Sequence, residues 1–311
     1  MIVSASRRTD IPAFFMPWLV NRLREGDVLV RSPFSPRRVA RVPLTPDVLD
    51  AMVLWSKNPL PMLPHLDALR DVPCYVQFTL TPYGRDIERN LPEKGILLDG
   101  FCELSRRIGP ERLVWRYDPI LINAKWTSDV HLAAFARMAG RLAGCTDTCT
   151  VSFLDHYRCM EKACAPLELY TPAPEVLTEL LAKMAEIAAQ NGMQLTTCAE
   201  SPELLPPGVS PARCIDPARL EKLLGCPLKL PRDANQRPDC GCARSVDIGC
   251  YNTCGNGCLY CYANWSDASI QRQRALYDPS SPLLCGQLTD EDIVTEKPFF
   301  SEKLLQTSLF D

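Results

Sequence analysis

Histidine is scarce in this sequence: there are three among 311 residues, and all three are isolated from one another. The chain also lacks a Walker phosphate loop, a G-x-G-x-x-G turn and a Ser-His-Asp order. Nothing therefore points to a P-loop nucleotide site, a dinucleotide fold or a triad hydrolase. We single out only His156, because it follows Asp155 at the end of an apolar run.

Long apolar runs are missing as well. No run approaches the roughly 20 residues that span a bilayer, and Met1–Arg8 contains no apolar signal-peptide segment. We therefore expect a cytoplasmic protein without a membrane partner. The net charge of −3 gives no overall attraction to nucleic acid. A local excess of six arginines over two acids in residues 22–41 is typical of a solvated surface, with a phosphate-facing surface as the alternative.

Cysteine, by contrast, is abundant, with 16 in the chain. Thiols stay reduced in the cytosol, so many cysteines in a cytosolic chain favour metal ligation over disulfides. The densest motif lies near the C-terminus and has the spacing Cys-x3-Cys-x2-Cys. Its members are Cys254, Cys258 and Cys261, which we call the three-cysteine loop.

The three-cysteine loop has the composition of an iron–sulfur site. Three thiolates can hold three irons of a cubane cluster and leave the fourth iron open. An open position separates catalytic metal sites from structural ones. Gly255 and Gly257 permit a tight turn that brings backbone N–H groups near a cluster. The motif therefore indicates chemistry as well as structure.

Apolar, β-rich runs alternate with helical patterns over the first 200 residues. The six runs are residues 2–4, 52–55, 75–80, 113–117, 149–153 and 193–197. The helical stretches are residues 13–24, 61–70, 96–108, 128–142 and 174–189. This alternation is typical of parallel βαβ units. We expect an α/β fold with a (β/α)6-type parallel barrel, partial or complete, in preference to a doubly wound sheet.

Polar side chains cluster where the predicted strands end. In parallel barrels these ends build the active site. Arg116 interrupts an apolar run, which is costly unless the charge is paired, and Asp118 or Glu200 is the expected partner. The candidate catalytic residues are Arg7, Lys57, Arg116 and Asp118. The candidate cofactor-binding residues are Thr79, Glu200 and Tyr260.

Composition divides the chain into four parts. Residues 1–200 form the barrel core, and residues 201–239 form a Pro-rich connection with a short helix capped by Asp216. The Cys-rich segment 240–265 is expected to close over the barrel mouth. Residues 266–311 form a polar tail.

A second group of four cysteines supplies enough thiolates for a fully ligated site, either iron–sulfur or zinc. Its members are Cys198, Cys214, Cys240 and Cys242, which we call the four-cysteine set. An alternative hypothesis is a structural zinc module that uses four thiolates. Its ligands would be Cys240, Cys242, Cys258 and Cys261. The other cysteines have no partner spacing, so we interpret them as packing or surface residues.

The three-cysteine loop, with an aromatic residue at Tyr260, resembles that of the radical S-adenosylmethionine (SAM) superfamily. The chain as a whole resembles a bacterial family catalogued only as a domain of unknown function, number 1848. The segments that carry this second resemblance are residues 4–12, 55–59, 77–81, 115–119, 198–200, 214–216, 240–242 and 247–264.

The superfamily resemblance implies a [4Fe–4S] cluster, with a second cluster as an open question. SAM would chelate the open iron, and one electron would cleave its sulfonium to give a 5′-deoxyadenosyl radical. It also implies a small-molecule substrate and an electron donor of reductase, ferredoxin or flavodoxin type. The cofactor would perform the difficult chemical step, the cleavage of SAM to a radical. Tyr260 would pack near the adenine.

The position of the loop departs from that superfamily, in which it follows the first strand. Residues 245–249 could be a strand that leads into the loop, as in a permuted barrel, or the loop could fold back over the barrel mouth. The departure also admits transfer of the aminocarboxypropyl group of SAM. A nucleic-acid repair enzyme similar to spore photoproduct lyase is a further alternative, which rests only on the N-terminal arginines.

Overall fold

The computed structural model describes residues 1–155 and 158–304, so His156 lies outside the described residues. All six strands that the sequence predicts are present in one sheet. They are β1 (Ile2–Ala5), β4 (Ala51–Ser56), β5 (Cys74–Thr79), β6 (Leu113–Ile120), β7 (Thr148–Phe153) and β8 (Gln194–Thr197). Neighbouring strands run parallel throughout. The α/β class is therefore confirmed.

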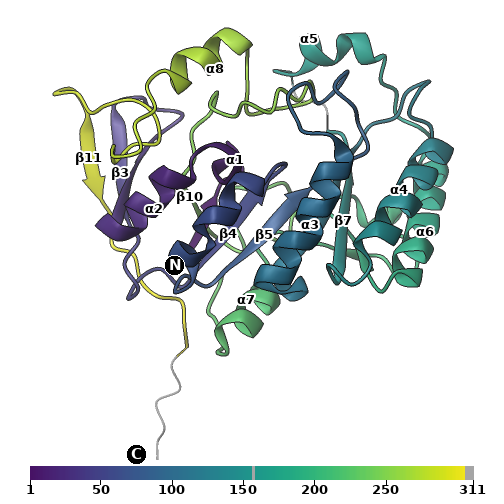
Figure 1. Ribbon diagram of the computed structural model, residues 1–311, viewed down its shortest axis with the longest axis horizontal. Helices are drawn as coiled ribbons and strands as arrows, with labels where there is room; N and C mark the ends of the chain where they lie inside the picture. Colours follow the sequence, from purple (N-terminus) through teal and green to yellow (C-terminus); the bar gives the residue numbers. More distant parts are fainter. Residues whose placement is uncertain (156–157, 305–311) are drawn as a thin grey trace, which may run out of the picture.

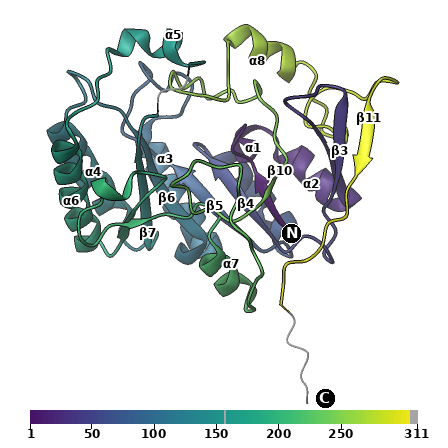
Figure 2. The same cartoon turned by 180° about the vertical axis from the view of Figure 1, so that it is seen from behind.

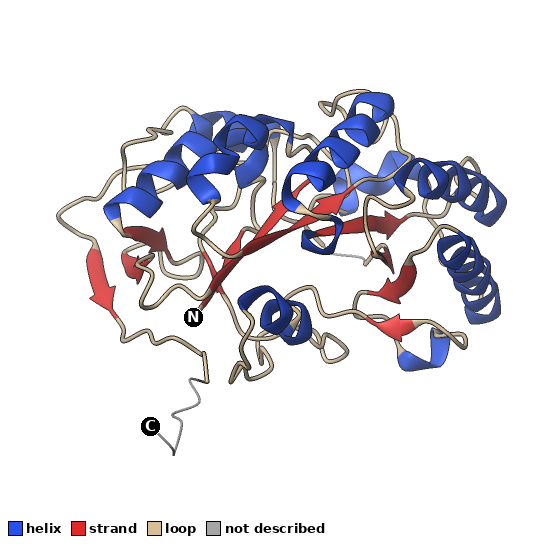
Figure 3. Cartoon of the chain, turned by 60° about the horizontal axis from the view of Figure 1, so that its bottom comes forward, coloured by secondary structure: helices blue, strands red, loops and turns tan. Residues whose placement is uncertain are grey.

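Two strands that we did not predict as part of the six-strand core extend this sheet to eight. They are β9 (Ser210–Pro211) and β10 (Val246–Asp247). The order is β10-β1-β4-β5-β6-β7-β8-β9, so the described strands form an open sheet with β10 and β9 at its edges. The count of six is too low because strands of two residues leave no hydrophobic alternation to detect. Figure 3 shows the strands as a curved array with most helices on its outer side.

The predicted helices are also present and pack on one face of the sheet (Figure 1). They are α1 (Ile11–Phe14), α2 (Met16–Glu25), α3 (Lys94–Ile108), α4 (Ser128–Leu142) and α6 (Pro174–Gln190). Thr127 caps α4 by accepting a hydrogen bond from the N–H of Val130. Residues Leu60–Leu69 form a 3₁₀ helix because Pro64 removes a backbone donor from its interior.

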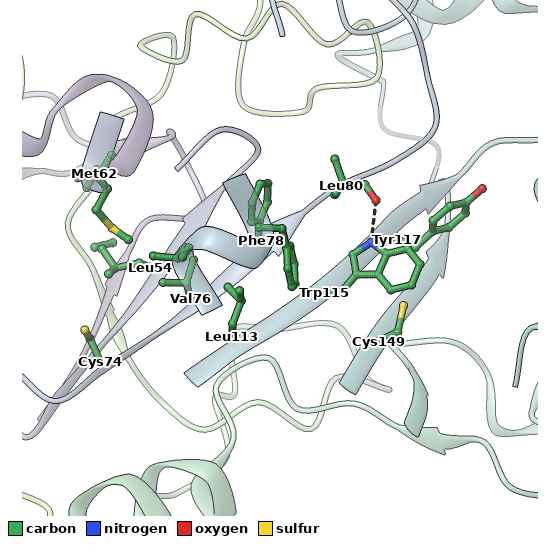
Figure 4. Packing of buried hydrophobic residues seen from close by; sticks show 14 of the residues in the cluster. Leu54, Met62, Cys74, Val76, Phe78, Leu80, Leu113, Trp115, Tyr117 and Cys149 are labelled. Atoms are coloured by element: carbon green, nitrogen blue, oxygen red, sulfur yellow. Dashed lines mark hydrogen bonds between the residues drawn. The ribbon is translucent and has the colours of Figure 1, made fainter. Parts of the chain in front are cut away.

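The main hydrophobic core lies between the helices and one face of the sheet. Alternate residues of neighbouring strands supply it, among them Leu54, Val76 and Trp115. The indole Nε1 of Trp115 donates a 2.9 Å hydrogen bond to the carbonyl of Leu80, so this large ring is buried without an unpaired donor (Figure 4). Cys149 packs in the same core, in agreement with its interpretation as a packing residue.

The opposite face of the sheet is covered by the chain that connects β9 to β10. Val53, Tyr75 and Val114 alternate with the core residues and pack against this connection, which includes α7 (Pro217–Leu224) (Figure 2). The Tyr75 hydroxyl donates a 2.7 Å hydrogen bond to the carbonyl of Cys214. α7 has the predicted Asp216 cap and ends at Gly225, which has a positive φ of 68°.

A second, smaller sheet was not predicted. It has the order β11-β3-β2 and is built from β2 (Asp27–Arg31), β3 (Arg38–Pro43) and β11 (Ile293–Glu296). It lies at one side of the molecule (Figure 1). Much of the basic stretch belongs to this sheet: Arg31 pairs with Asp292, and Arg41 pairs with Asp27. The many charged residues in this stretch mask the alternation of apolar and polar side chains by which a strand is predicted.

Two short helices were also missed, α5 (Glu161–Cys164) and α8 (Asp267–Arg274). α5 is a single turn, and α8 exposes polar side chains with no apolar stripe. None of the helices in the described ranges combines the length and the apolar character needed to cross a membrane.

Candidate functional site

A cavity of about 540 Å³ lies at the carboxyl ends of the parallel strands. Its size falls in the usual range of small-molecule sites, about 300–1,000 Å³. Trp55, Thr79, Arg116 and Ser152 line it from β4, β5, β6 and β7. Each alternates with a core residue of the same strand, so the pleat that buries one side chain against the helices turns the next into the cavity.

The three-cysteine loop and the four-cysteine set line this same cavity. The candidate residues Arg7, Lys57, Asp118 and Tyr260 line it too. Arg7, Lys57 and Asp118 were singled out because they follow predicted strands, and Tyr260 because it belongs to the three-cysteine loop. The structure therefore brings together nearly all the candidates, from segments up to about 250 residues apart in the sequence.

The strand β10 leads directly into the three-cysteine loop. It pairs with β1 in parallel, with Val3 opposite Val246 and Ser4 opposite Asp247. The expectation that residues 245–249 contain a strand is thus confirmed. The three-cysteine loop therefore follows the carboxyl end of an edge strand. It lies at the same edge of the sheet as the cavity residues of β4, β5, β6 and β7.

Asp247 fastens this strand to the end of β1. Its carboxylate accepts hydrogen bonds from the hydroxyls of Ser4 (3.0 Å) and Ser6 (2.6 Å) and from the backbone N–H of Arg7 (2.8 Å). It also pairs with Nε of Arg8 at 2.9 Å. Sequence reasoning missed Asp247 because its partners lie some 240 residues away.

Replacing Asp247 with asparagine is expected to lower the free energy of unfolding by about 1.5–3 kcal/mol, the range for hydrogen bonds to a charged group. The amide keeps the shape but loses the charge and part of the acceptor capacity. Thermal unfolding measures the change. Asp99→Asn is the matched control, because its ion pair with Arg141 is exposed and should contribute little. Equal melting temperatures for the two variants would show that Asp247 is not an anchor.

Hydrogen bonds to Asp10 and Asn90 hold the three-cysteine loop in place. The Asn256 amide donates to Asp10 at 2.8 Å, and Asp10 is buried. The Asn90 amide donates to the carbonyl of Gly255 at 2.8 Å. Gly257 has a positive φ of 68°, and a Cβ there would lie 2.8 Å from Asn90, so the turn requires glycine.

The sulfurs of the three-cysteine loop are left available by this network. Among the described residues, no side chain is hydrogen-bonded to the thiol of Cys254, Cys258 or Cys261, whereas backbone N–H groups of Asn256, Ala263 and Asn264 approach the sulfurs of Cys254 and Cys261. Burial raises the pKa of the Cys254 thiol well above its usual range. These three thiols therefore line the cavity without a side-chain partner.

The buried carboxylate of Glu88 supports the three-cysteine loop through a hydrogen bond to Tyr260. It is 0% exposed and accepts hydrogen bonds from Lys57 (2.7 Å) and Thr81 (2.7 Å), and also from Lys94 and the hydroxyl of Tyr260. Burial alone would favour the neutral acid, but the two lysines hold the pKa of Glu88 at about 2. Sequence reasoning missed Glu88, which lies in a loop with no motif.

Arg116 is paired as expected, and its partner is Asp118. The guanidinium is 4% exposed and also donates from Nη1 to Sγ of Cys214 at 2.8 Å. Arg7 stacks over Trp55, with its Cζ 5.0 Å from the ring centroid. In the part of the chain that the structure describes, Nη2 of Arg7 is buried without a hydrogen-bond partner.

Glu200 is placed differently from the other candidates. It is not among the described residues that line the cavity, and its Oε1 accepts a 2.8 Å hydrogen bond from the backbone N–H of Phe153. Burial raises its pKa to about 7. Glu200 is therefore not the partner of Arg116, because the carboxylate turns toward the end of β7 instead.

The four-cysteine set is brought together from three segments. Sγ of Cys198 lies 3.4 Å from Sγ of Cys214, and the N–H of Cys214 donates to Sγ of Cys242 at 3.2 Å. The thiol of Cys242 is hydrogen-bonded to those of Cys214 and Cys240. The ligands of the zinc hypothesis are thus divided: Cys240 and Cys242 join this set, whereas the other two belong to the three-cysteine loop.

Another pair of thiols was not predicted from spacing. Sγ of Cys145 lies 2.6 Å from Sγ of Cys102, next to the packed helices α3 and α4. Both were interpreted as isolated packing or surface residues.

Within residues 1–155 and 158–304, no three His, Cys, Asp or Glu side chains already stand in the arrangement of a bound metal ion.

The fold and the cavity define an α/β protein with a thiol-rich site at the carboxyl edge of a parallel sheet. The chain belongs to the family described as Domain of unknown function (DUF1848), whose sequence pattern matches residues 2–263. The match includes both cysteine groups and every strand except β11. No curated protein matches the chain.

Proposed function

We propose that this protein is a radical SAM-type iron–sulfur enzyme that acts on a small-molecule substrate. One observation carries the proposal: the three-cysteine loop faces the same cavity as the charged strand ends. A catalytic cluster needs that arrangement, because the reacting molecule must reach the open iron. The order of the strands agrees with a permuted partial barrel in which β10 takes the first position, beside β1.

The three-cysteine loop fits a [4Fe–4S] cluster by donor type and by setting. Thiolates are the usual ligands of such clusters, and these three thiols have no side-chain partner in a loop that hydrogen bonds to Asp10 and Asn90 hold in place. When bound and reduced, the cluster would supply the electron that cleaves the sulfonium of SAM. A cytoplasmic reductase, ferredoxin or flavodoxin would be the electron source.

In this proposal, the remaining cavity residues bind and orient SAM and the substrate. Arg7 offers a buried N–H donor to an anionic group of SAM or of the substrate. Arg116, held by Asp118, would position a second acceptor. Nζ of Lys57 lies 5.2 Å from the ring centroid of Tyr260, so a positive charge stands beside the three-cysteine loop. Thr79 and Tyr260 are the candidates for contact with the adenosyl part of SAM.

The alternatives receive less support. The arginines that favoured a nucleic-acid repair enzyme pair with acids of the smaller sheet and its neighbours, so less of their charge is left for phosphates. A zinc module without catalysis leaves unexplained why the three-cysteine loop opens onto a cavity lined with charged side chains.

Anaerobic reconstitution tests the proposal. The protein is incubated with iron and sulfide under reductant, desalted, and analysed for iron, sulfide and SAM cleavage. We expect about four irons and four sulfides per cubane cluster and SAM cleavage only after reduction. A protein that binds iron and sulfide but never cleaves SAM would contradict the enzyme proposal.

A further inference from the structure

The four-cysteine set brings its own sulfurs into contact with one another. The sulfurs follow one another in the order Cys198, Cys214, Cys242 and Cys240, and those of Cys198 and Cys214 lie 3.4 Å apart. Four thiolates around a single zinc ion, each about 2.3 Å from the metal, lie about 3.8 Å from one another. Thiolates that each bind a different iron of a cubane must stand much further apart. The observed contact is therefore close to the mononuclear arrangement.

Cations surround these sulfurs. Arg116 donates from Nη1 to Sγ of Cys214 at 2.8 Å, and Nη2 of Arg237 lies 3.9 Å from Sγ of Cys198. Arg7 lines the same part of the cavity. A divalent ion with four thiolates carries a net charge of −2, which is costly to bury without compensation. The guanidinium groups supply that compensation.

The backbone around the set is fixed independently of any ion. The N–H of Ala243 donates to the carbonyl of Ile215 at 3.0 Å, and the N–H of Asp233 donates to the carbonyl of Cys242 at 2.9 Å. These bonds join the chain after β9 to the chain before β10, the two edges of the open sheet.

We propose that the four-cysteine set binds one zinc ion that links the two open edges of the sheet. Zinc replaces the protons of the four thiols, which are released to solvent. The ion holds the connection that covers one face of the sheet and so keeps Arg116 at the cavity. This proposal is independent of the proposed function, because it concerns other ligands and needs no SAM.

Elemental analysis of purified protein tests the proposal. A variant with Cys254, Cys258 and Cys261 replaced by alanine is produced in zinc-containing medium, so that only the four-cysteine set can hold metal. We expect about one zinc per chain and no sulfide. Combining this variant with Cys240→Ser and Cys242→Ser should reduce zinc at least about tenfold. Cys226→Ser is the matched control, because it lies in the same connection but outside the set.

Cobalt substitution provides a second test of the site if the replacement of Cys240 and Cys242 prevents folding. Protein with the three alanines, produced with cobalt, should show the charge-transfer and visible bands of a tetrahedral thiolate site, and Cys198→Ser should shift them. Iron in place of zinc, with or without sulfide, would overturn the zinc assignment. A metal-free protein would overturn the site itself. Wild-type protein that holds this zinc ion but never cleaves SAM after reconstitution would count only against the proposed function.

Discussion

Cys258→Ser is expected to abolish SAM cleavage and to reduce the iron bound by the three-cysteine loop to background. The cluster depends on all three thiolates, and serine is a poor ligand for iron in such clusters. We expect a decrease of at least about 100-fold in the rate of SAM cleavage, which corresponds to about 2.7 kcal/mol in the barrier. Iron analysis and the rate of SAM cleavage under reductant measure both effects.

Cys250→Ser is the matched control for this substitution. Cys250 is partly buried and precedes the three-cysteine loop by four residues, but it is outside the motif. The control should keep wild-type iron content and activity. If Cys258→Ser retained both, the three-cysteine loop would not be the cluster site, and the proposed function would lose its basis.

Glu88→Gln is expected to lower the free energy of unfolding by about 3–5 kcal/mol, the cost of breaking a buried ion pair from one side. Glutamine cannot neutralise Lys57 and Lys94, which lie 15% and 24% exposed beside it. The loss should appear as a decrease of about 5–10 °C in the melting temperature. It should also weaken cluster retention, because Glu88 holds the hydroxyl of Tyr260 within the loop.

Glu179→Gln on α6 is the matched control, because its ion pair with Lys183 is exposed. Exposed pairs of this kind contribute little to stability, so its melting temperature should stay near that of the wild type. Equal unfolding curves for Glu88→Gln and Glu179→Gln would show that the buried network does not support the loop.

The sequence predicts the six main strands because each is a run of β-branched and aromatic residues. The open edges could not be found in this way. β9 and β10 have two residues each, and their place in the sheet depends on pairing with β8 and β1 rather than on any local pattern. The sheet formed by β2, β3 and β11 was missed for a related reason, since β11 comes from the tail.

The cavity residues could be predicted where they end a strand, as for Lys57 and Arg116. Their partners could be predicted less well. Asp118 is close to Arg116 in sequence and was found, whereas Glu88 and Asp247 act through residues on other elements. The contact of Cys198 with Cys214 required the three-dimensional structure, because spacing alone also allowed a set made of Cys240, Cys242, Cys258 and Cys261.

Electron paramagnetic resonance of the reduced, reconstituted protein tests the central claim most directly. The claim is that the three-cysteine loop holds a cluster with an iron open to the cavity. We predict the signal of a reduced [4Fe–4S] cluster and a clear change in that signal when SAM is added, because SAM binds the open iron. A cluster signal that SAM leaves unchanged would contradict the account.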